Sequence, residues 1–279
     1  MEITQLQNIA SQVRRDIVRQ VNAAASGHPG GSLGCADFFT ALYFHVMKHD
    51  PAFNMEGHGE DMFFLSNGHI SPVWYSVLAR SGYFEVSELA TFRKLDSRLQ
   101  GHPTPYEHLP GVRIASGSLG QGVSAAIGAA LGKRMDKDPG LVYVLTGDGE
   151  LEEGQIWEAL MSAAHYRLDN IIVTVDWNGQ QIDGSTEHVM SLGNLPAKME
   201  AFGWEVLLMN GNDMEQVVHT LELAKSKTGQ QRPIVILMST DMGYGVDFMM
   251  GSHKWHGIAP NAEQMRIALE QLPETLGDY

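Results

Sequence analysis

The feature that most constrains the fold is a pair of apolar runs separated by one helical segment. The runs are continuous and rich in β-branched side chains, and they occupy residues 141–146 (LVYVLT) and 170–175 (NIIVTV). Such runs are typical of strands covered on both faces. The segment between them, residues 154–166, has a helical pattern, so the unit predicts a right-handed βαβ crossover with parallel strands.

The rest of the chain continues this alternation. The first helix is amphipathic, since Leu6, Ile9, Val13, Ile17 and Val21 share one face at helical spacing. Further elements are expected at 26–34 (Gly-rich loop), 36–47 (helix), 62–65 (strand), 71–81 (helix), 96–111 (irregular loop), 123–135 (helix), 204–208 (buried strand), 214–227 (helix), 233–238 (buried strand) and 262–272 (helix). Alternating strands and helices predict an α/β fold, a doubly wound parallel sheet with helices on both faces. We expect a single domain over residues 1–279.

Charge and composition exclude several classes of partner. The formal net charge is −14, with 33 acidic and 19 basic residues, which argues against nucleic acid or an anionic membrane as the main partner. A phosphorylated substrate stays compatible, because positive groups focused in a cleft can outweigh the overall sign. The single cysteine, Cys35, excludes an intramolecular disulfide and a cysteine-based metal site. No signal peptide or membrane-spanning run precedes the fold, so we expect a cytoplasmic protein.

Polar residues follow the two best-defined strands. Gly147-Asp148-Gly149 comes after the first, and Asn178 follows the second. Because the carboxyl ends of neighbouring parallel strands meet at one edge of a sheet, the side chains of Asp148 and Asn178 are expected to converge. One carboxylate and one amide oxygen suit Mg²⁺, which usually completes its shell with phosphate oxygens and water. Glycines beside the aspartate let the backbone approach a phosphate, and the helix that follows offers free N–H groups.

The segment Gly147–Gly184 resembles the thiamine diphosphate motif, which begins with Gly-Asp-Gly and ends about 30 residues later in Asn. Its sequence is similar to that of transketolases in particular. The resemblance implies that Asp148 and Asn178 hold the metal together with a backbone carbonyl near Gln180. It also implies that Gly149 donates its N–H to the diphosphate. The cofactors implied are thiamine diphosphate and Mg²⁺, with Ca²⁺ or Mn²⁺ as substitutes.

Five histidines lie in loops or beside glycines, within the motifs SGHPGGSLG, NGH, QGHP and GSHKWHG. Imidazole can donate to hydroxyls and phosphates and can transfer protons near neutral pH. These motifs and SGSLGQG match successive transketolase signatures in order. The resemblance implies that His28 and His102 contact substrate hydroxyls, and that His69 and His256 lie by the diphosphate, with His256 also in proton transfer. It places Gly117 and Leu119 at the aminopyrimidine ring.

Several residues depart from the family pattern or have weaker roles. Most relatives carry Pro where this chain has Ser118, and Trp177 replaces a polar residue before Asn178. Glu153 matches a glutamate at the subunit interface of transketolases, and we count it with the cofactor-binding residues. For Glu152 we expect only a favourable interaction with the helix dipole. His253 matches a position beside the site, and the remaining histidines are expected to be structural.

The resemblance also implies a missing half. No segment matches the transketolase domain whose glutamate activates the aminopyrimidine, and the arginines that grip the substrate phosphate are absent. We therefore expect the N-terminal subunit of a split transketolase, active only with a complementary C-terminal subunit that carries the pyrimidine-binding domain, as a dimer of heterodimers. A fragment of a longer enzyme is the alternative, although the ending LPETLGDY is typical of a finished terminus.

The activity implied is transfer of a two-carbon ketol unit from a ketose phosphate to an aldose phosphate. Rival interpretations are a split 1-deoxyxylulose-5-phosphate synthase, an alpha-type subunit of a 2-oxo-acid dehydrogenase, and a catalytically silent interaction subunit. His28, His69 and His102 would serve a polyhydroxylated substrate and favour transketolase. The retained Asp148, Gly149 and Asn178 argue against a silent subunit.

Overall fold

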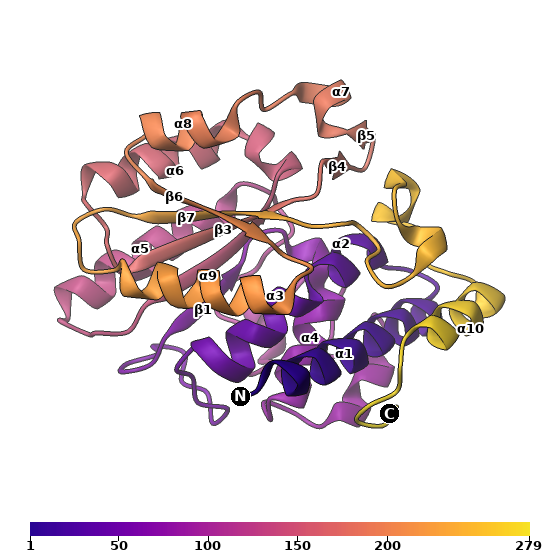
Figure 1. Ribbon diagram of the computed structural model, residues 1–279. Helices are drawn as coiled ribbons and strands as arrows, with labels where there is room; N and C mark the ends of the chain where they lie inside the picture. The colour runs from indigo at the N-terminus through magenta and orange to yellow at the C-terminus, as the bar shows by residue number, and fades with distance from the viewer.

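A computed structural model describes all residues, 1–279, and contains a five-stranded parallel sheet between two layers of helices (Figure 1). The strand order is β1-β2-β3-β7-β6. The strands are β1 (Met62–Leu65), β2 (Val142–Gly147), β3 (Ile171–Trp177), β6 (Glu205–Asn210) and β7 (Ile234–Ser239). The predicted doubly wound α/β class is confirmed, because neighbouring strands are parallel and helices cover both faces.

Helices from different parts of the chain form the two layers, as Figure 1 shows. One face carries α5 (Gln121–Met135), α6 (Gly154–His165) and α8 (Leu195–Ala201). The other carries α1 (Ile3–Ala24), α3 (Ala36–Ala41), α4 (Ser71–Arg80) and α9 (Met214–Ser226), and α10 (Ala262–Gln271) packs on α1. None of these helices is both long and apolar enough to cross a bilayer.

The core explains why the strand sequences are apolar without interruption. In β2, Val142 and Val144 pack against α5 and α6, whereas Tyr143 and Leu145 pack on the opposite side. Successive strand residues point to opposite faces of a sheet, so two-sided burial requires an apolar residue at every position. The crossover β2–α6–β3 is therefore confirmed, and its two strands are direct neighbours.

Close packing of α5 on the sheet depends on a small residue. A Cβ added at Gly122 would stand 2.6 Å from the Cα of Ser66, just after β1. That distance is shorter than real Cβ contacts, so the helix can begin against the end of β1 only with glycine at this position. The loop before α5 is held at the carboxyl edge of the sheet as a result.

Two expectations about regular structure are wrong. The Gly-rich segment is helical over α2 (Pro29–Gly34), where Pro29 fixes the first helical position, and the helix that follows ends in a π turn, η1 (Leu42–Val46). The strand at 204–208 is not buried on both faces. It corresponds to β6, which pairs only with β7 at the edge of the sheet, and its Leu208 is 66% exposed.

Short elements that the sequence did not indicate complete the edge of the sheet. A hairpin of β4 (Gln180–Gln181) and β5 (Gly184–Ser185) follows β3 and leads into α7 (Thr186–Met190). The 3₁₀ turns are η2 (Gly68–Ile70), η3 (Val86–Thr91), η4 (Pro105–Glu107), η5 (Gly149–Glu152), η6 (Asp247–Met249) and η7 (His253–His256). The β4 strand packs against η7, which brings the C-terminal part of the chain over the end of β3.

Candidate functional site

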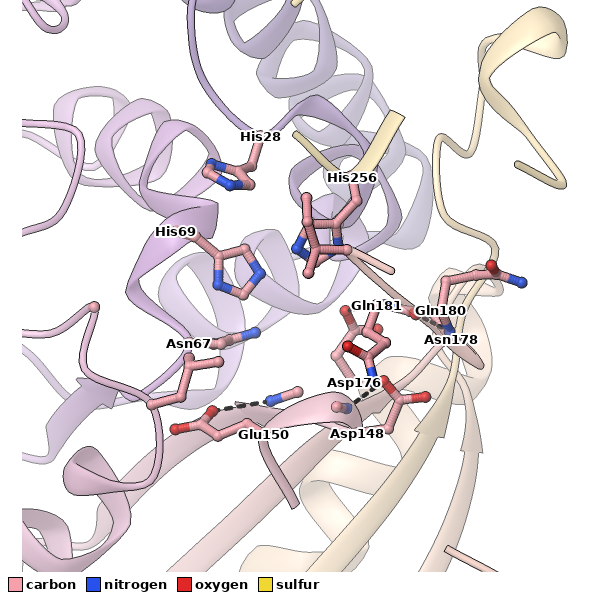
Figure 2. A pocket seen from close by; sticks show the side chains of 16 residues that line it. His28, Asn67, His69, Asp148, Glu150, Asp176, Asn178, Gln180, Gln181 and His256 are labelled. Carbon is pink, nitrogen blue, oxygen red and sulfur yellow. Dashed lines mark hydrogen bonds between the residues drawn. The ribbon is translucent and has the colours of Figure 1, made fainter. Parts of the chain in front are cut away.

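A cavity of about 280 Å³ lies at the carboxyl ends of the central strands (Figure 2). In an open parallel sheet this edge is where ligands bind. Segments far apart in the sequence form its wall: His28 and Gly31, Asn67 and His69, Gly117 and Leu119, residues 147–150, Asp176 with Asn178 and Gln180–Ile182, and His256.

The polar residues after β2 and β3 converge at the floor of this cavity. Gly147 lies opposite Asp176 in the pairing of the two strands, so the loops that follow leave the sheet side by side. The Gly179 N–H donates to Asp148 Oδ2 at 2.6 Å. The Asn178 amide donates to Asp176 Oδ2 at 2.8 Å. Asp148 and Asn178, predicted to converge, therefore share one hydrogen-bonded cluster.

The cluster holds two buried carboxylates, because Asp148 and Asp176 are 1% and 2% exposed. Burial, and then the charge of Asp176, raise the pKa of Asp148 to about 7, although backbone N–H groups partly oppose this shift. Burial also raises the pKa of Asp176, against hydrogen bonds from Thr240, Asn178 and Cys35. All donors to both carboxylates are neutral N–H, O–H or S–H groups, so a cation would relieve the repulsion between them.

The chemistry of the oxygen atoms fits one class of metal ion. The protein has no cluster of three or more His, Cys, Asp or Glu side chains that could hold a metal by itself. A site here would combine one carboxylate with amide and carbonyl oxygens, and would need further ligands from phosphate or water. That arrangement suits Mg²⁺, which keeps part of its shell outside the protein.

Three histidine rings form the opposite wall, as Figure 2 shows. The ring centroids of His69 and His256 are 4.9 Å apart, and those of His28 and His69 are 5.1 Å apart. Burial and the neighbouring His256, Arg93 and His102 lower the pKa of His28 to about 4. Burial likewise lowers the pKa of His69 and of His256. The rings are therefore neutral near pH 7, and each can donate one hydrogen bond and accept another.

His102 lies at the rim of the cavity, not in its wall. Its ring centroid is 6.4 Å from that of His28, and the side chain is exposed. A Cβ at Gly117, where φ is 129°, would stand 2.8 Å from the His102 ring. Glycine at that position therefore lets the loop before α5 pass directly under the histidine, while Gly117 and Leu119 line the cavity.

Three residues singled out from the sequence lie outside the cavity. Glu153 is exposed and occupies the position before α6, with its side chain next to Gly120. His253 is exposed at the start of η7. The Glu152 carboxylate accepts from the Gln181 amide at 2.9 and 3.0 Å, so it fastens the β4–β5 hairpin as well as facing a helix start.

The cavity also contains residues that the sequence reasoning did not select. Asn67 directly precedes Gly68-His69, and Asp176 lies two residues before Asn178, so proximity to a motif was an available signal for both. Glu150 follows Gly-Asp-Gly and offered the same signal. The remaining ones lie inside segments already singled out, but nothing in those patterns distinguished them from their neighbours: Gly31 in SGHPGGSLG, and Gln181 and Ile182 in Gly147–Gly184.

Unpaired polar atoms indicate what the cavity could accept. Three atoms in or beside it are shielded from solvent and have no hydrogen-bond partner: His28 Nδ1, Asn67 Oδ1 and Ser116 Oγ. A buried polar group without a partner costs about 1–3 kcal/mol. The cavity is therefore suited to a polar ligand that brings hydrogen-bonding atoms of its own.

Comparison with known proteins agrees with this geometry. Residues 5–274 match the family model described as transketolase, thiamine diphosphate binding domain. The chain is 38% identical over 271 residues to one subunit of the apulose-4-phosphate transketolase of Actinobacillus succinogenes, covering 97% of this chain and 96% of that protein. It is also 38% identical over 267 residues to the 6-deoxy-6-sulfo-D-fructose transketolase subunit SqwG of a Clostridium species, covering 96% of each.

Longer transketolases match over part of their length. Human transketolase is 36% identical over 255 residues, which is 90% of this chain and 39% of that protein. The crystal structure of transketolase from Campylobacter jejuni superposes with a TM-score of 0.90 at 36% identity, covering 98% of this chain and 43% of the other. All these relatives are named as transketolases or their subunits, which favours that interpretation over the rival thiamine diphosphate enzymes. The chain belongs to the transketolase family, as a transketolase-type subunit that carries the thiamine diphosphate binding domain.

Proposed function

We propose that residues 1–279 form a single domain that binds thiamine diphosphate with Mg²⁺ and acts together with a complementary C-terminal transketolase subunit. The pair transfers a two-carbon ketol unit from a ketose phosphate to an aldose phosphate. The observation that carries this proposal is the convergence of Asp148 and Asn178 at the ends of two neighbouring strands, opposite three neutral histidines. The proposed compartment is the cytoplasm, because the substrates are phosphorylated sugars.

The metal ligands in this proposal are the Asp148 carboxylate, the Asn178 amide oxygen and the Gln180 backbone carbonyl. The Gln180 N–H donates to Asn178 Oδ1 at 2.9 Å, which fixes the amide oxygen and leaves it a second lone pair. The Gly149 N–H, which donates to Asp148 Oδ1 at 2.8 Å, is the proposed backbone donor to the diphosphate. Mg²⁺ is the preferred ion for this donor set, and Ca²⁺ or Mn²⁺ are the proposed substitutes.

Thiamine diphosphate, when bound, supplies the electron sink for breaking and forming the C–C bond. The proposed task of this chain is to orient the reactants and manage protons. His69 and His256 hold the diphosphate, and His256 also moves a proton at its ring nitrogen. His28 and His102 donate to substrate hydroxyls. The neutral state of these rings supports both tasks, since a neutral imidazole has one donor and one acceptor nitrogen.

The ring end of the cofactor is assigned to the loop before α5 and to the partner. Gly117 and Leu119 are the proposed contacts to the aminopyrimidine, through backbone and side chain, and both line the cavity. A volume of about 280 Å³ lies just below the range for small-molecule sites, which is roughly 300 to 1,000 Å³. That size supports a site completed by another polypeptide. Glu153, exposed beside Gly120, is the proposed link to that interface.

The assembly and the substrates are proposed from the relatives. The chain covers 96% of a relative that is itself named as one transketolase subunit, but only 39% of human transketolase. This contrast supports a separate C-terminal subunit within a dimer of heterodimers. Relatives named for apulose-4-phosphate and 6-deoxy-6-sulfo-D-fructose widen the substrate class beyond pentose phosphates. The net charge of −14 argues against nucleic acid or an anionic membrane as a partner, and it is compatible with small sugar phosphates only where positive groups are focused in a cleft.

The test is glycolaldehyde transfer by the purified chain, alone and mixed with the complementary subunit. The donors are xylulose 5-phosphate, apulose 4-phosphate and 6-deoxy-6-sulfofructose, an aldose phosphate is the acceptor, and pyruvate is the control donor for rival enzymes. We expect no transfer by the chain alone and transfer by the mixture, abolished by Asp148→Ala but not by the exposed Asp136→Asn. Turnover by the chain alone would contradict the two-subunit proposal, and inactivity of the mixture towards every sugar would contradict the transferase itself.

A further inference from the structure

We infer that Asn67 is a further cofactor-binding residue, whose side-chain amide donates a hydrogen bond to the diphosphate. This inference rests on the proposed function. It is carried by a buried amide that lines the cavity and has no partner within the chain. No motif assigned a role to Asn67, which lies at the end of β1 just before the Gly68-His69 pair.

Asn67 differs from the other buried amides, Gln12 and Gln20, because neither end of its side chain is paired. The residue is 1% exposed, its Oδ1 is shielded and unpaired, and its Nδ2 makes no hydrogen bond to another residue. By contrast, Asn178 pairs both ends of its amide, and Asn170 donates to the Ala130 carbonyl at 2.9 Å although its Oδ1 has no partner. Asn212 donates to the Gly34 carbonyl at 2.9 Å. The Nδ2 group is therefore a free donor at the cavity wall, and a ligand with acceptor oxygens would give it the partner that the chain does not supply.

The position of Asn67 identifies which part of the ligand it would meet. In Figure 2 the amide lies between the His69 ring and the loop that carries Asp148 and Glu150. A Cβ built on Gly147 would stand 3.8 Å from Asn67 Nδ2. The nitrogen therefore faces the start of the Gly-Asp-Gly turn, which is the proposed seat of the diphosphate.

Hydrogen bonds fix the backbone around Asn67, so its amide cannot move towards another partner. Glu150 accepts from the Ser66 hydroxyl at 2.5 Å and from the Gly147 N–H at 3.2 Å. Ser66 directly precedes Asn67, and Gly147 is the residue that Asn67 Nδ2 faces. The Asn67 carbonyl also accepts from the Ile70 N–H at 3.1 Å. A donor held in place before the ligand arrives loses little entropy on binding.

A neutral donor is well matched to this location. Three buried carboxylates, those of Asp148, Glu150 and Asp176, already line the cavity. An amide N–H can bind a phosphate oxygen without competing with a metal ion for these carboxylates. An aspartate at position 67 would instead add a further negative charge facing the phosphate, so Asn67→Asp and Asn67→Ala are expected to differ.

The experiment is calorimetry of the chain mixed with its complementary subunit, in Mg²⁺, titrated with thiamine diphosphate and separately with inorganic pyrophosphate. We expect Asn67→Ala to weaken both affinities about 10- to 100-fold, the range for a hydrogen bond to a charged group. Asn67→Asp should bind more weakly than Asn67→Ala. The control Asn194→Asp adds the same charge at an exposed helix cap that a carboxylate can still serve, and it should bind like wild type.

The outcomes separate this inference from the proposed function. Absence of cofactor binding by the wild-type mixture would contradict the proposed function. If the wild-type mixture binds the cofactor and both Asn67→Ala and Asn67→Asp bind it as tightly as wild type, only the role of Asn67 is overturned. The same holds if the variants lose affinity for thiamine diphosphate but not for pyrophosphate. Thermal unfolding checks that each variant is folded. If either variant does not fold, Asn67→Ser is used instead, because it keeps a small donor. Its affinity should be lower than that of wild type by less than about 100-fold, and an unchanged affinity would again overturn the inference.

Discussion

The two ends of the central sheet differ in how some of their buried charged groups are paired. Next to the amino ends of β1 and β2, the buried Lys133 ammonium donates to Asp138 and to two backbone carbonyls, all within 2.9 Å. The Asp61 carboxylate there accepts from two backbone N–H groups at 2.8 and 2.9 Å. Each of these side chains is satisfied within the chain.

At the carboxyl ends of the same strands, pairing is incomplete. Asn67 has no partner, and Asp148 lies next to a second buried carboxylate with only neutral donors around it. Proteins commonly accept such costs where they bind ligands. We infer that one end of the sheet stabilises the fold, whereas the other end is arranged to bind a cation and an anion as ligands.

The strongest test of this division is the substitution Lys133→Met. Removing a buried ammonium leaves two carbonyls without their donor and Asp138 without its cation, so we expect the free energy of unfolding to fall by about 3–5 kcal/mol. Urea denaturation measures this loss. The exposed Lys137→Met is the matched control and should change stability by less than about 0.5 kcal/mol. A small effect of Lys133→Met would contradict the claim that the paired groups at the amino end stabilise the fold.

Next in size is Asp148→Asn, which neutralises a buried charge at the other end. We expect affinity for thiamine diphosphate in Mg²⁺ to fall at least about 100-fold in calorimetry, because a metal ligand is lost. Stability without ligand should change by less than about 1 kcal/mol, since release of the repulsion from Asp176 offsets a lost hydrogen bond. A destabilisation as large as that of Lys133→Met would show that both ends are equally structural.

Glu150 sharpens the comparison, because it is a fully paired group at the carboxyl end. Its carboxylate accepts from Ser66, Gly120, Thr146 and Gly147. An amide in its place can accept at only one atom, so Glu150→Gln should lower the free energy of unfolding by about 2 kcal/mol. Glu158→Gln, exposed on α6, is the control. If the free energy of unfolding of Glu150→Gln equals that of wild type, these four contacts do not fix the cavity wall.

The smallest expected effect is a pH dependence at the amino end. Although burial opposes the shift, the N–H groups of Gly59 and Gly140 and the Lys133 ammonium lower the pKa of Asp138 to about 2. A lowered pKa stabilises the fold above the ordinary value near 4, and that stability is lost as the pH falls towards 2. The stability difference between wild type and Asp138→Asn should therefore shrink by about 1 kcal/mol between pH 4.5 and 2. A constant difference would contradict the shift.

Much of the fold could be predicted because the central strands and their crossover helix are long and strongly patterned. The same logic predicted that Asp148 and Asn178 meet, since neighbouring parallel strands end at one edge. The edge position of β6 could not be predicted, because strand order is decided by packing between distant segments. The helix α2 was missed because its glycines favour loops by themselves, whereas burial on all sides holds them helical here.

The site divides in the same way. Residues inside recognisable motifs, such as His28 and His69, were selected from the sequence and line the cavity. Asn67 and Asp176 were not, because their significance lies in what surrounds them: one lacks a partner, and the other faces a second carboxylate. Such relations join strand ends that are remote in the sequence. The roles proposed for the motif residues stay predictions until ligand binding is measured.

The cavity wall unites His28 and His256, whose ring centroids are 5.5 Å apart although they lie far apart in the sequence. During synthesis the amino-terminal part of a protein emerges and begins to fold first. A nascent chain from which His256 has not yet emerged therefore lacks one wall of the pocket. Nascent chains should stay unable to retain the coenzyme until that histidine has emerged and docked, a late event in translation of this segment.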